Sequence, residues 1–215
     1  MSDIAQNLAR VRAAIPPGVT LVAVSKTQPP EAIRAAYAAG QRDFGENYAQ
    51  EWRDKARALE DLPDVTWHFI GALQTNKVKY LVGKIAWVHT VDRLPLAQEL
   101  SRRSAACAVT TRVLLEVNVG GEASKSGCSP ADVPPLAAAV ARLPGLALKG
   151  LMCIPPAGPD PRPYFETLRR LRDALPLSLP DLSMGMSGDY PIAIAEGATI
   201  VRVGTAIFGA RPPPR

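Results

Sequence analysis

Short apolar runs alternate with amphipathic stretches along the whole chain. Eight runs are predicted to be strands, and most are continuous rather than alternating, which is typical of parallel strands covered on both faces. They lie at 20–25, 41–45, 66–70, 86–91, 113–119, 148–154, 182–186 and 200–203. A helix is also predicted over residues 3–14, before the first strand, because Ile4, Leu8 and Val11 recur at helical spacing.

Helix start and stop signals separate these strands. Pro29-Pro30 opens one predicted helix and Gly40 ends it, Asn47 is suited to cap the next, and Ser187 to cap a short helix that ends near residue 197. Eight strand–helix units predict an α/β fold, a single-domain (β/α)8 TIM barrel over residues 1–215 with an extra N-terminal helix. A doubly wound sheet is the alternative, but no G-x-G-x-x-G segment follows the first strand.

Composition and charge narrow the classes of function. The chain has 215 residues, 47% of them hydrophobic, and a formal net charge of +5. The charge makes nucleic-acid binding an alternative, but arginines and acidic residues are interspersed, so a mildly basic surface is favoured. There is no membrane-length apolar run and no leader pattern, which predicts a cytoplasmic protein. Three cysteines without C-x-x-C spacing and two separated histidines predict neither a disulfide framework nor a metal site.

Lys26 closes the apolar run at 21–25. An amine at the inner end of a buried strand is costly unless it is paired or used. One interpretation is a lysine whose side chain reaches to water. The other is an amine whose pKa is lowered by burial and nearby cations, and which forms an imine with an aldehyde. Lys125, in the glycine-rich segment 120–127, is better suited to a gate or a secondary phosphate contact.

Two glycine-containing turns late in the chain predict an anion site. Ser187-Gly188 follows the seventh predicted strand, and Gly204-Thr205 follows the eighth. In barrels of this kind, the loops after these two strands often bind phosphate through backbone N–H groups and the start of a short helix. A phosphate cradle together with Lys26 predicts a phosphorylated aldehyde as a covalently held ligand.

Arg202 lies within the last strand, two residues before that cradle. It is either a buried arginine paired with a carboxylate, for which Glu46, Glu116 and Glu196 are available, or a donor aimed at a ring nitrogen. Arginine stays protonated, so it would leave that nitrogen unprotonated and weaken the ring as an electron sink.

Two further polar residues each have two interpretations. Asn47 is either a helix cap or a contact beside the aldehyde end of the ligand, or both. His68 either lines the pocket, with a role as a base, or is a core histidine whose hydrogen bonds are satisfied.

Seven segments together resemble the pyridoxal phosphate homeostasis protein family, also described as alanine-racemase N-terminal-domain-like. They are AVSKTQP (23–29), DFGENYAQE (43–51), WHFIGALQTNK (67–77), EVNVGGEASKSG (116–127), KGLMCIPP (149–156), LSMGMSGDY (182–190) and VRVGTAIFGAR (201–211). They follow one another over nearly the whole chain.

The resemblance implies a barrel that holds pyridoxal 5′-phosphate (PLP) as a Schiff base on Lys26. It also implies that Arg202 faces the pyridine nitrogen, that Asn47 lies near the cofactor, and that the phosphate is held by Ser187, Gly188, Gly204 and Thr205. The family is linked to control of vitamin B6 and, through it, to amino-acid and keto-acid balance. No catalytic turnover is generally accepted for it.

Two functions follow from this resemblance. The first is a homeostatic protein that holds PLP reversibly and passes it to client enzymes or buffers it. The second is an amino-acid racemase, which needs bases on both faces of the cofactor. Related racemases take the opposing tyrosine from a second domain and a partner subunit, and the five tyrosines of this chain offer no evident substitute. We therefore expect a monomeric PLP-binding protein without catalytic residues, metal, nucleic acid or membrane.

Overall fold

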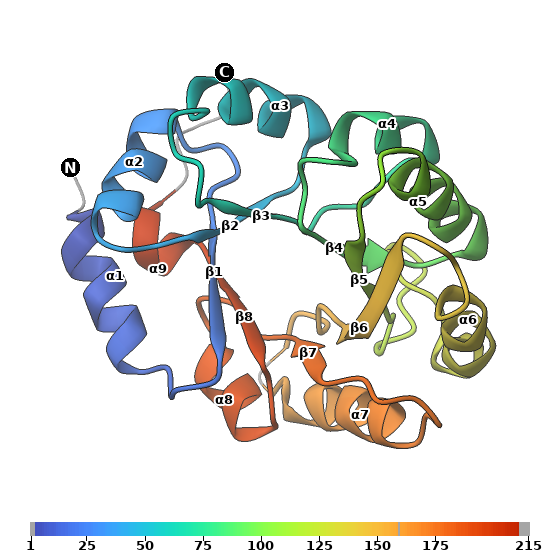
Figure 1. Ribbon diagram of the computed structural model, residues 1–215. Helices are drawn as coiled ribbons and strands as arrows, with labels where there is room; N and C mark the ends of the chain where they lie inside the picture. Colours follow the sequence, from blue (N-terminus) through green and yellow to red (C-terminus); the bar gives the residue numbers. More distant parts are fainter. Residues whose placement is uncertain (1–2, 159, 211–215) are drawn as a thin grey trace.

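Eight parallel strands close into a barrel in the order of the sequence (Figure 1). The computed structural model describes residues 3–158 and 160–210. Its strands are β1 (Thr20–Val24), β2 (Asp43–Glu46), β3 (Thr66–Phe69), β4 (Trp87–Val91), β5 (Thr111–Glu116), β6 (Leu146–Met152), β7 (Asp181–Ser183) and β8 (Ile200–Val203). The predicted (β/α)8 barrel is confirmed.

Helices surround the barrel on its outer side (Figure 1). They are α1 (Ile4–Ala13), α2 (Pro30–Ala38), α3 (Ala49–Ala58), α4 (Val78–Leu81), α5 (Leu94–Ala106), α6 (Val133–Val140), α7 (Arg162–Asp173), α8 (Tyr190–Ala195) and α9 (Thr205–Phe208). The 3-10 turns η1 (Thr75–Lys77) and η2 (Pro130–Asp132) precede α4 and α6. Pro30 starts α2, and Gly40 follows its end with a φ of +89° that favours glycine.

The predicted N-terminal helix is present as α1. It packs against α9, and Asn7 Nδ2 donates a hydrogen bond to the carbonyl of Ile207 at 3.1 Å. This contact ties the first helix to the segment that follows β8. Within the residues that the structure describes, no helix has both the length and the apolar character that crossing a bilayer requires.

Some strand ends differ from the predicted ones because hydrogen bonds are used elsewhere. β2 begins at Asp43 rather than at Gln41, whose backbone N–H donates to the carbonyl of Ala36 at 3.0 Å, at the end of α2. β5 ends before Asn118, whose N–H donates to the carbonyl of Cys128 at 2.9 Å instead of continuing the ladder with β6. A polar loop therefore starts where the sequence predicts a longer strand.

Two layers of apolar side chains follow from the two-residue period of the strands. A small cluster inside the barrel comes from four strands and consists of Val22, Leu114, Met152 and Ile200. A larger cluster joins the outward-facing strand residues to the helices. Val24 and Arg202 lie two residues beyond Val22 and Ile200 on β1 and β8, so the same period points them into the mouth of the barrel.

Candidate functional site

A cavity of about 240 Å³ opens where the strands end. Its lining includes all seven residues predicted to hold the ligand: Lys26, Asn47, Ser187, Gly188, Arg202, Gly204 and Thr205. Val24, Gln28, Ile70, Ile154, Met186 and Gly209 complete the wall. The seven predicted residues, which are up to 179 positions apart in the sequence, are thus brought to one place by the strands β1, β2, β7 and β8.

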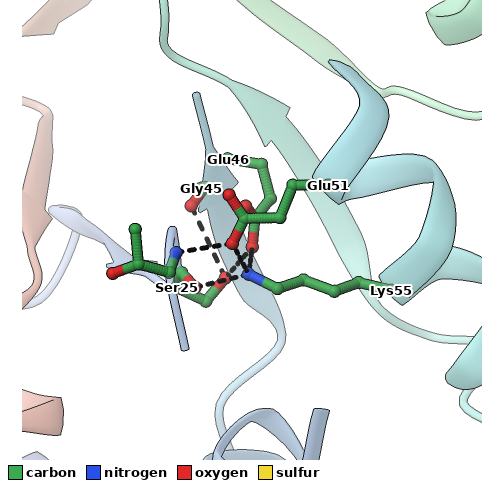
Figure 2. A network of polar contacts seen from close by, with 6 residues as sticks. Ser25, Gly45, Glu46, Glu51 and Lys55 are labelled. Carbon is green, nitrogen blue, oxygen red and sulfur yellow. Dashed lines mark hydrogen bonds and ion pairs between the residues drawn. The ribbon is translucent and has the colours of Figure 1, made fainter. Parts of the chain in front are cut away.

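Lys26 is half-buried at the end of β1, and both of its neighbours in the chain are fixed by an ionic cluster (Figure 2). Lys55 Nζ, from α3, donates to the carbonyl of Ser25 at 2.6 Å. It also donates to Glu46 Oε1 at 2.8 Å and to Glu51 Oε1 at 2.6 Å.

The carboxylates of Glu46 and Glu51 also accept hydrogen bonds from the residues on either side of Lys26. Ser25 Oγ donates to Glu46 Oε1 at 2.6 Å, and the N–H of Thr27 donates to Glu51 Oε1 at 2.5 Å. Thr27 has a φ of +64°, a left-handed conformation that is uncommon for a threonine. The cluster therefore holds the backbone on either side of Lys26 in one path.

Burial makes this cluster costly unless its members stay together. Lys55 is 5% exposed and Glu46 is fully buried. Burial raises the pKa of Glu46, and the ammonium of Lys55 and the hydroxyl of Ser25 oppose that rise. Lys55 is absent from the residues singled out in the sequence, because a Glu51–Lys55 pair at i,i+4 ordinarily indicates an exposed helix face.

Arg202, on β8, is 3% exposed and lines the cavity. It donates from Nη1 to Ser183 Oγ at 2.6 Å and from Nη2 to the carbonyl of Cys153 at 2.9 Å. Burial lowers its pKa, and the nearby negative groups, Glu116 among them, oppose that change.

The alternative in which Arg202 pairs with a carboxylate is wrong for the described residues. Glu46 belongs to the Lys55 cluster, and Glu196 binds Arg162 and Arg169 at 2.5 and 2.9 Å. Glu116 acts on Arg202 only through its charge. The guanidinium is thus held by neutral acceptors on one side while it lines the cavity on the other.

The two late turns meet at Ser187. Its Oγ accepts hydrogen bonds from the N–H groups of Gly204 and Ala206, at 3.2 and 3.3 Å. The interpretation of Ser187 as a cap of α8 is wrong, since Asp189 occupies the N-cap position without a side-chain hydrogen bond. Ser187 instead links the loop after β7 to the start of α9 beside the cavity.

Gly188 and Gly204 differ in the space around their backbone. A Cβ at Gly204 would lie 3.3 Å from the carbonyl oxygen of Val24, so β1 limits the space there. A Cβ at Gly188 would meet no protein atom within 4 Å. Gly188 also lines the cavity, so the described protein atoms leave room for a side chain at this part of the wall.

Asn47 does not cap α3, because Tyr48 occupies that position and makes no side-chain hydrogen bond. Its Oδ1 is buried and has no partner among the described residues. Asn47 also lines a second cavity of about 190 Å³, together with Glu116, Asn118, Lys125 and other residues. The interpretation that remains for this side chain is a contact to a ligand.

Lys125 contacts the protein rather than the main cavity. Its Nζ donates to the carbonyl of Pro155 at 3.0 Å and pairs with Glu122 at 2.5 Å. His68 is a fully buried core histidine with two hydrogen-bonding partners, which settles its two interpretations. In the described part of the chain, no three His, Cys, Asp or Glu residues gather as metal ligands would.

Comparisons with known proteins show the family to which the chain belongs. Residues 1–212 match the family described as alanine racemase, N-terminal domain. The chain is 51% identical to the pyridoxal phosphate homeostasis protein of Pseudomonas aeruginosa, over 98% of this chain and 97% of the relative.

Solved structures extend the likeness to the fold. PipY of Synechococcus elongatus, in a structure with PLP bound, is 42% identical, with a TM-score of 0.90 over 96% of this chain and all of that one. Alanine racemase of Corynebacterium glutamicum has a TM-score of 0.75 at 19% identity, over 98% of this chain and 61% of the racemase, which shows a shared fold.

Glu116 offers a test of the electrostatics beside the site. Burial and Asp92 raise its pKa to about 7, against the attraction of Arg202. A raised folded-state pKa gives stability that is present below pH 4.5 and lost as the pH rises through 7. Glu116→Gln removes that loss, so its stability relative to the wild type should rise by roughly 3 kcal/mol between pH 4.5 and pH 8. Urea unfolding at both pH values measures the difference, and a difference that does not change with pH would contradict it.

Proposed function

Because this chain belongs to the pyridoxal phosphate homeostasis protein family, we propose that it holds PLP reversibly in the cavity at the mouth of the barrel. In this role it buffers the cofactor or passes it to client enzymes, and so affects amino-acid and keto-acid balance. A monomeric state is part of the same proposal. The observation that carries it is the meeting of an amine, a cluster of N–H and hydroxyl groups and a guanidinium in one cavity.

The residues present fit the chemical groups of PLP. An aldehyde needs an amine, a phosphate needs hydrogen-bond donors, and a pyridine nitrogen needs one donor. Lys26, the Ser187–Gly204 region and Arg202 supply these in turn. PLP supplies an aldehyde that forms a reversible covalent bond with an amine.

The bond to Lys26 is a Schiff base. Lys26 Nζ forms a carbon–nitrogen double bond with the aldehyde carbon, and the aldehyde oxygen leaves as water. The ionic cluster around Ser25 and Thr27 supports this role, because it fixes the backbone from which the Lys26 side chain enters the cavity. Addition of water reverses the bond and releases the ligand.

The phosphate is held by the turns after β7 and β8. Ser187, Gly188, Gly204 and Thr205 line one stretch of the cavity wall. Hydroxyl groups and backbone N–H groups are the donors that phosphate sites on barrels use. The open face of Gly188 supports a close approach of the ligand to the backbone.

Arg202 favours storage over catalysis. A guanidinium keeps its protons, so it donates to the ring nitrogen and leaves that nitrogen unprotonated. An unprotonated ring withdraws electrons less strongly and stabilises a carbanion less. Asn47, with its unpartnered oxygen, contacts the ligand near the aldehyde end.

An amino-acid racemase is the second candidate, and it is favoured by the likeness to the racemase fold. Racemisation needs a base on each face of the cofactor. Lys26 is one base, but no tyrosine and no histidine lines the cavity that the described residues form. We therefore expect racemisation of alanine no faster than with free PLP, measured by chiral chromatography. Turnover above that level which is lost in Lys26→Ala would support the racemase instead.

The Schiff base predicts a spectrum that depends on Lys26. The purified protein loaded with PLP should show the absorbance band of a protonated imine, and Lys26→Ala should lose it. Lys125→Ala is the control and should keep the band, because Lys125 contacts Pro155 and Glu122 rather than the main cavity. Borohydride reduction followed by peptide mapping should place the label on Lys26. A protein that remains colourless after incubation with PLP would refute the proposal.

A substitution at Gly188 should affect PLP binding without affecting the stability of the fold. A Cβ there meets no protein atom, so Gly188→Ala should unfold at the same urea concentration as the wild type. If the phosphate lies against this backbone, the methyl group should weaken PLP binding about tenfold or more. Gly158→Ala, at an exposed glycine with equal space around it, is the control. Unchanged PLP affinity in Gly188→Ala would place the phosphate elsewhere.

A further inference from the structure

A chain of four hydrogen bonds crosses the interior of the barrel below the cavity. It runs from Arg202 Nη1 to Ser183 Oγ (2.6 Å), from Ser183 Oγ to His89 Nδ1 (2.9 Å), from His89 Nε2 to His68 Nδ1 (2.9 Å) and from His68 Nε2 to Asp43 Oδ1 (3.0 Å). The five residues come from β8, β7, β4, β3 and β2. Arg202 and Asp43 lie at its two ends.

The chemistry of the end groups gives the chain one direction. A guanidinium can only donate and a carboxylate can only accept, so with two neutral imidazoles between these ends Ser183 Oγ accepts from Arg202 and gives its own proton to His89 Nδ1. His89 Nε2 then carries the proton that His68 Nδ1 accepts. His68 Nε2 carries the proton that the Asp43 carboxylate accepts. With both imidazoles neutral, this is the arrangement of protons that satisfies all four bonds.

The surroundings keep both rings neutral and fixed. His68 and His89 are fully buried, and burial lowers the pKa of each. Arg112 adds to this effect at His68 and Asp43 opposes it, while His68 and Arg202 add to it at His89. The Trp87 ring stacks on His68 at 5.8 Å between centroids and meets His89 edge-on at 6.0 Å.

We propose that His68 and His89 are positioning residues that orient the Arg202 guanidinium toward the cavity. Ser183 transmits their effect. Together with the carbonyl of Cys153, it fixes one donor on each Nη of Arg202, so the guanidinium cannot turn in its plane. Asp43, whose side chain is 32% exposed at the start of β2, anchors the far end. The identity of the ligand that Arg202 meets rests on the proposed function, whereas the chain is a property of the protein without PLP.

The direction of the chain is tested first without any ligand. His68 and His89 are the only two histidines in the sequence, so nitrogen NMR of tag-free, PLP-free protein gives two ring systems. At pH 7 both should be neutral and protonated on Nε2. A ring that is cationic, or that carries its proton on Nδ1, would overturn the proposed chain whether or not PLP binds.

The positioning of Arg202 is tested with a matched pair of serines. Ser183→Ala removes the link between Arg202 and His89. Ser104→Ala removes an equally buried hydroxyl that bonds Thr111 Oγ1 at 2.8 Å, outside this chain. Ser183→Ala should weaken PLP binding by about five- to tenfold and shift the absorbance maximum of the bound cofactor. Ser104→Ala should change neither, although both variants lose a buried hydrogen bond.

Each outcome of this second test has one meaning. Equal affinity and equal spectra in the two serine variants would assign Ser183 a purely structural role and overturn the positioning of Arg202. A shift of the Arg202 side-chain nitrogen signals in PLP-free Ser183→Ala, absent from Ser104→Ala, would support it independently of the cofactor. Failure of the wild type to bind PLP would refute the proposed function alone.

Discussion

The site depends on one buried ion cluster, in which Lys55 bridges Glu46 and Glu51 beneath the end of β1 (Figure 2). Charges buried in this way seldom add stability, because desolvation offsets their attraction. Their contribution here is geometric. Lys55 and Glu51 bind the backbone on either side of Lys26, at Ser25 and Thr27, and the second of these residues adopts a left-handed conformation. The buried ammonium of Lys55 thus helps to hold the backbone from which Lys26 reaches the cavity.

A second set of buried polar contacts supports Arg202 on β8, the strand that pairs with β1 on the side away from β2. Inward-facing positions alternate along each strand, so the interior holds an apolar layer around Ile200 and, two residues further along β8, a charged group at Arg202. Arg202 is almost fully buried, so its charge needs hydrogen-bonding partners within the protein. The neutral acceptors Ser183 and Cys153 satisfy it, and His89 and His68 continue the polar path away from the cavity. Lys26 and Arg202 are thus both held in place by buried polar groups whose hydrogen-bonding partners are defined.

Sequence patterns predict much of this architecture because they report local physics. Continuous apolar runs give the eight strands, and Lys26 and Arg202 stand out as charges where a strand should be apolar. Hydrogen-bonding partners that come from distant segments of the chain leave no local pattern, so the sequence does not predict them. Arg202 has carboxylates available in the sequence but bonds a serine, and Asn47 resembles a cap but leaves that position to Tyr48. Lys55 resembles a surface lysine until the strand beside it is placed.

The same contacts bear on whether the site stores a cofactor or uses it. Catalysis on an amino acid requires a ring that accepts electrons and a second base opposite the first. In the proposed function the ring meets the Arg202 guanidinium rather than a carboxylate, and the described lining residues include no tyrosine or histidine to oppose Lys26. The proposed Schiff base on Lys26 is compatible with reversible holding, since addition of water releases the aldehyde. The proposed contacts would therefore favour retention and exchange of the ligand over its chemical conversion.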